Sequence, residues 1–274
     1  MSANLYALGA IALWATLASL GVSLGHVPPF LLTGLALVIG SIPAWPLVRQ
    51  WKIAPSTLAL GVCGLFGYHF LLFIALRHAP AVEANLVNYL WPLLIVALAP
   101  ALVPGIRMRA AHLAAALTGL AGAAVAILGS GTAAGGGWAW GYLPALGAAF
   151  IWATYSLLTR RVKAFPTAAI GLFGLVSGTL SLACHWALEP RVALSVTDWG
   201  LIAIMGLGPL GAAFFLWDKA LKLGDPRHIG ILSYITPLAS TLLLMVVSGR
   251  PMTWSIGAAA VLIIGAAVVG TRVR

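Results

Sequence analysis

The chain has 274 residues, of which 62% are hydrophobic and 7% are charged, and its formal net charge is +10 at pH 7. Soluble domains carry about 25% charged residues, so a surface this poor in charge is typical of a protein that faces lipid. The basic residues sit in short gaps between apolar runs, which favours a role as topology signals and argues against nucleic acid as a partner.

Ten apolar runs follow one another along the chain. Each has roughly 20 residues, enough to cross a hydrocarbon layer of about 30 Å. They lie at about 4–24, 30–48, 57–77, 82–103, 110–129, 138–159, 167–187, 200–221, 227–248 and 252–270. Runs of this length without period-two alternation predict helices and not barrel strands. The sequence therefore predicts an all-α integral membrane protein with ten transmembrane helices.

The Lys and Arg residues are divided unevenly between the two sides of the membrane. With ten spans, one side holds both termini and the gaps after spans 2, 4, 6 and 8, and it carries twelve of the 15 basic residues. The other side carries Arg77, Arg191 and Arg250. The positive-inside rule then predicts that both termini are cytoplasmic. The first run has no basic segment before it and no clear cleavage site, so it is expected to remain as the first span.

The two halves of the chain resemble each other in sequence. A shift of 145 residues lays "ALRHAPAVEANLVNYLWPLL" (Ala75–Leu94) over "ALKLGDPRHIGILSYITPLA" (Ala220–Ala239) without a gap, so that Tyr89 meets Tyr234. Near the start of each half, a shift of 138 lays "LGAIALWAT" over "LGAAFIWAT". The chain is therefore expected to consist of two repeats.

The predicted division is residues 1–130 with spans 1–5, a Gly-rich connector at 131–137, and residues 138–274 with spans 6–10. Because each repeat has an odd number of spans, the second must insert upside down relative to the first. Inverted repeats are typical of transporters, which expose one central site alternately to the two sides of the membrane.

Each repeat has a proline near the middle of a span, Pro92 in span 4 and Pro237 in span 9. Proline leaves the carbonyl four residues earlier without its donor, here that of Asn88 or Ser233. Polar backbone at membrane depth is tolerated where it is buried in protein or lines a watery cavity. We therefore predict two interrupted helices, with Pro92 and Pro237 as the points of break and gating, that meet at a central site. Ordinary helix packing is the alternative for each polar stripe.

The predicted substrate-binding residues are polar or aromatic side chains at internal depth. Trp and Tyr usually gather at the membrane interfaces, so rings at mid-span favour a cavity wall that stacks on an apolar or aromatic group. His69 lies deep in span 3, where it either contacts a substrate carboxylate or bonds to a neighbouring helix. The full predicted set is Trp14, Tyr68, His69, Asn85, Asn88, Tyr89, Trp91, Trp152, Tyr155, Trp217, Ser233 and Tyr234.

The chain has five acidic residues, and none falls at the centre of a span. Proton relays in membranes are built from such groups, so the pattern favours facilitated diffusion over proton coupling, with His69 and Glu83 as the groups that would reverse this. Glu83 is expected to pair with Arg77 or His78. There is no Walker sequence, HExxH motif or nucleophile–base pair at matched depth, which predicts a non-enzyme without metal or cofactor.

The motifs "NYLWPLL" and "SYITPLA", with the "LWAT" of span 1, resemble the EamA-type exporters of the drug/metabolite transporter superfamily. The resemblance covers essentially the whole chain. It implies a bacterial inner-membrane protein that exports amino acids through a cavity between its halves without ATP. Aromatic and other neutral amino acids are the expected substrates, lipid is the surrounding partner, and a monomer is the expected functional unit. The alternative is a proton-coupled exporter of another small metabolite or drug with the same fold.

Overall fold

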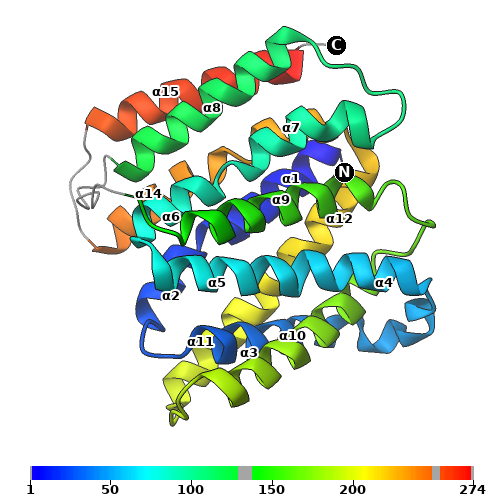
Figure 1. Cartoon of the computed structure of the whole chain (residues 1–274), viewed down its shortest axis with the longest axis vertical. Helices are drawn as coiled ribbons and strands as arrows, with labels where there is room; N and C mark the ends of the chain where they lie inside the picture. Colours follow the sequence, from blue (N-terminus) through cyan, green and yellow to red (C-terminus); the bar gives the residue numbers. More distant parts are fainter. Residues whose placement is uncertain (1, 129–137, 249–253, 273–274) are drawn as a thin grey trace.

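The computed structural model describes residues 2–128, 138–248 and 254–272, and the predicted connector at 131–137 lies outside this part of the chain. All regular secondary structure in the described residues is helical, which confirms the predicted all-α class. The helices are stacked from α8 and α15 at one edge of the molecule to α3 and α10 at the opposite edge (Figure 1).

The bounds of the helices follow the predicted apolar runs closely. The first half of the chain contains α1 (Ala3–Ala15), α2 (Leu17–Ser23), α3 (Pro29–Ser41), the 3-10 helix η1 (Ile42–Trp51), α4 (Pro55–Val62), the π-helix η2 (Cys63–Gly67), α5 (Tyr68–His78), α6 (Ala81–Asn88), α7 (Trp91–Leu102) and α8 (Ala110–Leu128). The second half contains α9 (Tyr142–Leu158), α10 (Ala169–Leu188), α11 (Val196–Leu207), the π-helix η3 (Gly208–Ala212), α12 (Ala213–Leu223), α13 (Pro226–Leu232), α14 (Ile235–Ser248) and α15 (Trp254–Arg272).

Within the described ranges, eight helical segments are long and apolar enough to cross a membrane, some of them made of two or three consecutive helices. Two further apolar helices, Tyr142–Leu158 and Trp254–Gly270, are shorter. Segments of this length and composition are typical of a multi-pass membrane protein. Whether all ten cross the membrane stays a prediction.

Two helical segments are interrupted just before the prolines of the repeat. α6 ends at Asn88 and α7 begins at Trp91, while α13 ends at Leu232 and α14 begins at Ile235. Pro92 and Pro237 lie in the first turns of α7 and α14, where a backbone N–H would have no acceptor within the helix, so proline is tolerated there. Each break therefore falls shortly before the proline and not at it.

From the two π-helices to the two helix breaks, the order of elements recurs in the two halves with an offset of 145 residues. The π-helix Cys63–Gly67 corresponds in this way to the π-helix Gly208–Ala212, and each is followed by an α-helix of 11 residues. The packing recurs as well, because α3 packs on α10, α8 on α15, α1 on α12 and α5 on α9. The first two pairs each join corresponding elements of the two halves, and the last two pairs correspond to each other.

Glycines allow α3 to approach its neighbours closely. A Cβ on Gly178 of α10 would lie 2.8 Å from the carbonyl oxygen of Gly34, and a Cβ on Gly40 would lie 2.5 Å from the carbonyl oxygen of Gly206 in α11. No L-side chain fits at such distances unless a backbone moves. Small residues at helix interfaces are the usual means by which membrane helices come into contact.

Glu189, directly after α10, joins three helices at one end of the bundle. Its Oε1 accepts hydrogen bonds from the backbone N–H of Phe30 at 3.0 Å and from the Arg77 guanidinium at 2.9 Å. Its Oε2 accepts from the backbone N–H of Leu31 at 3.2 Å and lies 3.0 Å from Nδ1 of His185. The side chain is 1% exposed, so the carboxylate is buried but fully paired at the N-terminus of α3.

The expected pairing of Glu83 with Arg77 or His78 is wrong. Arg77 contacts Glu189, and the ring of His78 packs against Trp140 with centroids 4.3 Å apart. Both carboxylate oxygens of Glu83 are buried without a hydrogen-bond partner in the described structure. The partner of Arg77 comes from the other half of the chain, so proximity along the sequence pointed to the wrong carboxylate.

Replacing Glu189 with alanine is expected to lower the free energy of unfolding by about 2 kcal/mol, because two amides of α3 lose their acceptor in a buried position. Arg77→Ala is expected to cost less than about 1 kcal/mol, since the Arg77 side chain is 38% exposed and the α3 amides keep their partner. Thermal unfolding of both variants in detergent measures the difference. A larger loss for Arg77→Ala would contradict the view that Glu189 acts mainly as a cap of α3.

Candidate functional site

A cavity of about 500 Å³ lies between the two halves of the chain. Its wall is formed by side chains of α1, α2, α3, α5, α6, α7, α9, α11, η3, α12 and α14. Small-molecule sites in proteins typically have volumes of about 300–1,000 Å³. The size therefore suits a ligand of a few hundred daltons or less.

The cavity collects most of the residues that the sequence singled out. Helices α1, α5, α6, α7 and α9 bring them there, together with Tyr89 at the break that follows α6. Those that line it are Trp14, Tyr68, His69, Asn85, Asn88, Tyr89, Trp91 and Trp152.

Four residues of the predicted set lie outside the lining, in helix interfaces next to it. Tyr155 packs on Gly64 of η2, and Tyr234 packs on Gly119 of α8. The indole N–H of Trp217 donates to Ser156 Oγ at 3.1 Å. The hydroxyl of Ser233 donates to the carbonyl of Gly230 at 2.6 Å. Pro92 and Pro237 also lie outside the lining.

The structure adds polar residues that the sequence analysis did not select. Thr236 and Ser240 of α14 line the cavity, as does Thr33 of α3. Thr236 and Ser240 are one helical turn apart and follow the break in span 9, which is the signal that could have found them. The sequence analysis selected Ser233 and Tyr234 at the break itself, whereas the face of α14 that lines the cavity carries Thr236 and Ser240.

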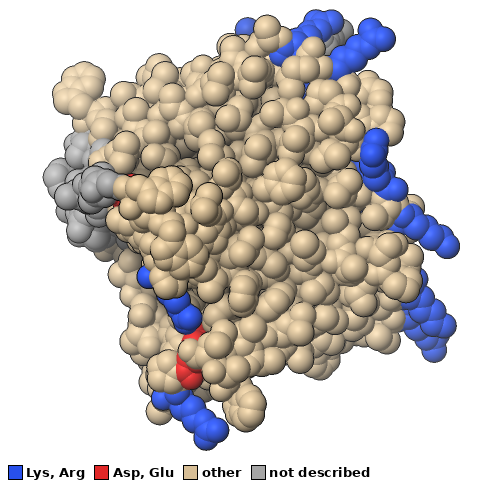
Figure 2. All heavy atoms as spheres, in the orientation of Figure 1, with Lys and Arg blue, Asp and Glu red and all other residues tan. Residues whose placement is uncertain are grey.

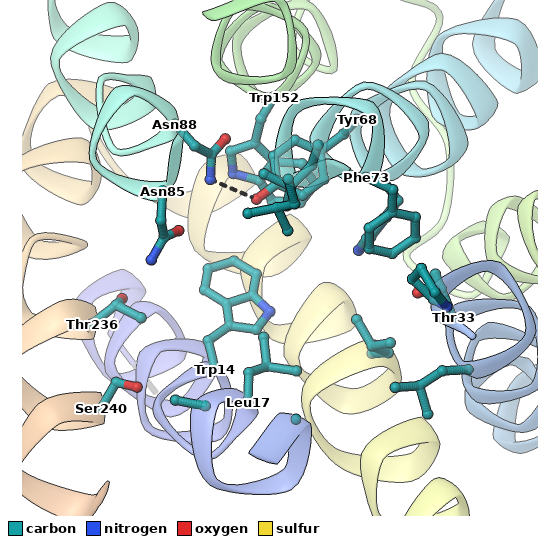
Figure 3. Close-up of a pocket in the computed structure, with 18 of the residues that line it drawn as sticks. Trp14, Leu17, Thr33, Tyr68, Phe73, Asn85, Asn88, Trp152, Thr236 and Ser240 are labelled. Atoms are coloured by element: carbon teal, nitrogen blue, oxygen red, sulfur yellow. Dashed lines mark hydrogen bonds between the residues drawn. The ribbon is translucent and has the colours of Figure 1, made fainter. Parts of the chain in front are cut away.

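Asn88 and Thr236 are the buried polar groups of the wall that keep unused hydrogen-bonding capacity. The Asn88 amide Nδ2 donates to Tyr68 Oη at 3.1 Å, which leaves Asn88 Oδ1 buried without a partner (Figure 3). Thr236 Oγ1 is also buried without a partner. Buried polar atoms are nearly always hydrogen-bonded, so these two are candidates for contact with a ligand.

His69 is held among aromatic rings. Its Nδ1 lies 2.6 Å from the carbonyl oxygen of Leu65 in η2, so Nδ1 carries a proton and donates it to that carbonyl. The ring centroid lies 5.0 Å from that of Tyr68 and 6.1 Å from that of Phe73. The bond to a carbonyl of the π-helical turn fixes the orientation of the imidazole. Its acceptor lies four residues earlier in the same span, whereas the packing alternative had placed it in a neighbouring helix.

A cluster of tryptophans forms part of the cavity wall, with Trp14, Trp91 and Trp152 in the lining and Trp217 packed against them. The ring centroid of Trp14 lies 6.5 Å from that of Trp91, 5.8 Å from that of Trp152 and 5.2 Å from that of Trp217. The Trp14 indole N–H donates to the carbonyl of Pro209 in η3 at 3.1 Å. Such edge-to-face contacts and the hydrogen bond hold the rings in place. From this cluster, the lining extends to Gly21, Pro29, Leu76 and Ala81 at helix ends.

Comparison with known proteins gives a consistent result. Residues 1–128 and 139–271 match the EamA-like transporter family. The chain is 44% identical to a protein of Ancylobacter novellus named aromatic amino acid exporter YddG, over 98% of this chain and 97% of that protein. It is 28% identical to a protein of the same name from Escherichia coli, over 96% and 94% of the two chains.

A solved structure described as "Crystal structure of protein" superimposes with a TM-score of 0.92 at 43% sequence identity, covering 98% of this chain and 95% of that one. The resemblance drawn from the motifs of spans 1, 4 and 9 is confirmed, and it extends to the exporters named YddG.

Proposed function

Because this chain belongs to the EamA-like transporter family, we propose that it exports amino acids across the bacterial inner membrane, with aromatic and other neutral amino acids preferred. The relatives named aromatic amino acid exporters, matched over nearly the whole chain, support this substrate class.

The observation that carries the proposal is the composition of the cavity wall. Trp14, Trp152 and Phe214 offer apolar ring surface, while Asn88 and Thr236 offer buried polar atoms without partners. A neutral amino acid combines an apolar side chain with a zwitterionic head, and it needs both kinds of surface. Both halves of one chain supply this wall, so we infer that a single copy forms the pathway.

Alternating access between two inverted repeats of five spans is the mechanism we infer. It is supported by the offset of 145 residues that relates the π-helices and helix breaks, and by the exchange of packing partners between the halves. In such transporters the two halves rock around one central site. We include Tyr142–Leu158 and Trp254–Gly270 among the ten spans.

The orientation follows from the distribution of basic residues. Lys and Arg side chains gather at the edge of the molecule toward which both termini lie (Figure 2). By the positive-inside rule we assign this edge to the cytoplasm. The tryptophan cluster then lies on the cytoplasmic side of the cavity, and the helix ends at Gly21 and Pro29 lie on the outer side. We infer that this arrangement is an outward-facing state.

Facilitated diffusion is the mode of transport that we favour. None of the described residues that line the cavity is an Asp or Glu, the groups from which membrane proton relays are usually built. His69 lines the cavity and is the group through which a proton-coupled exporter of another metabolite or drug would act.

Purified protein in liposomes is expected to equilibrate radiolabelled phenylalanine without ATP or a pH gradient, and protein-free liposomes serve as the control. Labelled lysine and glutamate are expected to enter more slowly, because the wall has no charged partner for their side chains. Uptake that required an imposed proton gradient would contradict facilitated diffusion. An absence of amino acid uptake under every gradient would contradict the proposed substrate class.

A further inference from the structure

Three of the polar residues that line the cavity lie on one side of it. Asn85 of α6 and Thr236 and Ser240 of α14 lie on one side of the view in Figure 3, and Thr33 and Phe73 lie on the other. α6 and α14 belong to different halves of the chain, and each adjoins one of the two helix breaks. A ligand in the cavity therefore meets polar groups of both halves on the same side.

Asn88 and Thr236 stand out on this side because they are buried and unsatisfied. Asn88 is 4% exposed and Thr236 is 6% exposed. Asn88 uses its amide N–H on Tyr68, so its free oxygen can only accept a hydrogen bond. The Thr236 hydroxyl has no partner and can donate one.

The local fields of the two half-helices differ in sign. Asn88 is the last residue of α6, where the free carbonyls give the helix end a partial negative charge. Thr236 lies in the first turn of α14, a helix of 14 residues whose N-terminal end has a partial positive charge. The end of α6 therefore favours a cation beside Asn88, and the start of α14 favours an anion beside Thr236. The start of α7 and the end of α13 partly offset these two fields.

We propose that Asn88 and Thr236 form the subsite for the head of the amino acid, with the ammonium group on Asn88 Oδ1 and the carboxylate on the Thr236 hydroxyl. The apolar side chain of the substrate then lies against the rings of Trp14, Trp152 and Phe214. This inference rests on the proposed function, and it specifies which residues of the same cavity recognise the ammonium and carboxylate groups of the substrate.

The same geometry disfavours His69 as the carboxylate ligand. Its Nδ1 proton is used on the Leu65 carbonyl. In a neutral imidazole with Nδ1 protonated, Nε2 is an acceptor and repels a carboxylate oxygen. The hydroxyl of Thr236 is a buried donor of the wall without a partner, and it can take this role.

The test uses two analogues of phenylalanine in the liposome assay. Phenethylamine lacks the carboxylate, and 3-phenylpropionate lacks the ammonium group. For Thr236→Val, the half-saturating concentration of phenylalanine is expected to rise about tenfold, while the inhibitory concentration of phenethylamine stays unchanged. Thr57→Val, which removes a hydroxyl of α4 that is also buried and without a partner but does not line the cavity, is the matched control and is expected to change neither value.

The reciprocal pair tests Asn88. Asn88→Leu is expected to raise the half-saturating concentration of phenylalanine about tenfold and to leave inhibition by 3-phenylpropionate unchanged. Tyr68→Phe, which removes the partner of Asn88 Nδ2 but keeps Oδ1, is expected to retain the discrimination between the two analogues.

Ratios of inhibition within one variant do not depend on how much protein is folded. If Thr236→Val weakens the binding of phenylalanine and of phenethylamine equally, or if Thr57→Val has the same effect as Thr236→Val, the head subsite is wrong although amino acid transport stands. If the unmodified protein takes up no amino acid at all, it is the proposed function that fails.

Discussion

Trp152→Ala is expected to lower the rate of phenylalanine uptake at least about tenfold. Trp152 is 4% exposed and lies in the middle of the aromatic cluster, with ring centroids 5.4 Å from Tyr68, 5.7 Å from Phe214 and 6.4 Å from Trp91. Removing the indole takes away ring surface that lines the cavity and leaves a void in the aromatic cluster. A loss of about 1.4 kcal/mol in stabilisation of the transport step is enough for a tenfold decrease in rate.

Trp199→Ala is the matched control for this effect. Trp199 lies near the N-terminus of α11, is 48% exposed and does not line the cavity, so uptake by this variant is expected to stay close to that of the unmodified protein. Both variants are compared at equal amounts of reconstituted protein. Equal losses in the two variants would count against the cavity as the substrate pathway.

Gly40→Leu is expected to prevent stable folding. A Cβ at this position would lie 2.5 Å from the carbonyl oxygen of Gly206 and 2.9 Å from the Cα of Gly211, and both obstacles are backbone atoms that cannot rotate away. The interface of α3 with α11 and η3 must therefore open, at a cost of at least about 3 kcal/mol. The yield of monodisperse protein in detergent and its thermal unfolding measure this loss.

Gly257→Leu provides the control for a leucine placed on a helix. Gly257 lies in α15, and apart from its own helical turn no atom of the described residues comes within 4 Å of the Cβ that would be added there. Its substitution is expected to change the free energy of unfolding by less than about 0.5 kcal/mol. If the two leucine variants unfold at the same temperature, the close approach of α3 to η3 is not a requirement of the fold.

The interrupted helices show where prediction from sequence worked and where it stopped. Pro92 and Pro237 were recognised because proline removes a backbone donor wherever it occurs, and the breaks lie just before them. The face that each half-helix turns inward was not recognisable in the same way. Ser233 and Tyr234 point into helix interfaces, whereas Thr236 and Ser240 line the cavity.

Among the charged residues too, local contacts could be predicted from the sequence and contacts between distant helices could not. Asp225 and Asp218 make the local contacts that their spacing suggests: Asp225 caps α13, and Asp218 lies 2.7 Å from Lys222 four residues away. Glu189 instead binds Arg77, 112 positions away along the chain, and the Glu83 pairing inferred from proximity is wrong. Contacts within one helical turn are fixed by local geometry, and contacts between distant helices depend on how the whole bundle packs.

By itself, the sequence determined the all-helical class, the family, the near-positions of both helix breaks and most of the aromatic and amide residues around the cavity. These properties follow from hydrophobic length, from the chemistry of proline and from a repeated motif, all of which can be read locally. The tertiary structure alone decided which polar atoms remain unpaired in the cavity, which aromatic rings pack together at its wall, and at which glycines two helices come into close contact. Those outcomes depend on the rotation of each half-helix about its axis, and that rotation is set by packing between segments far apart in the chain.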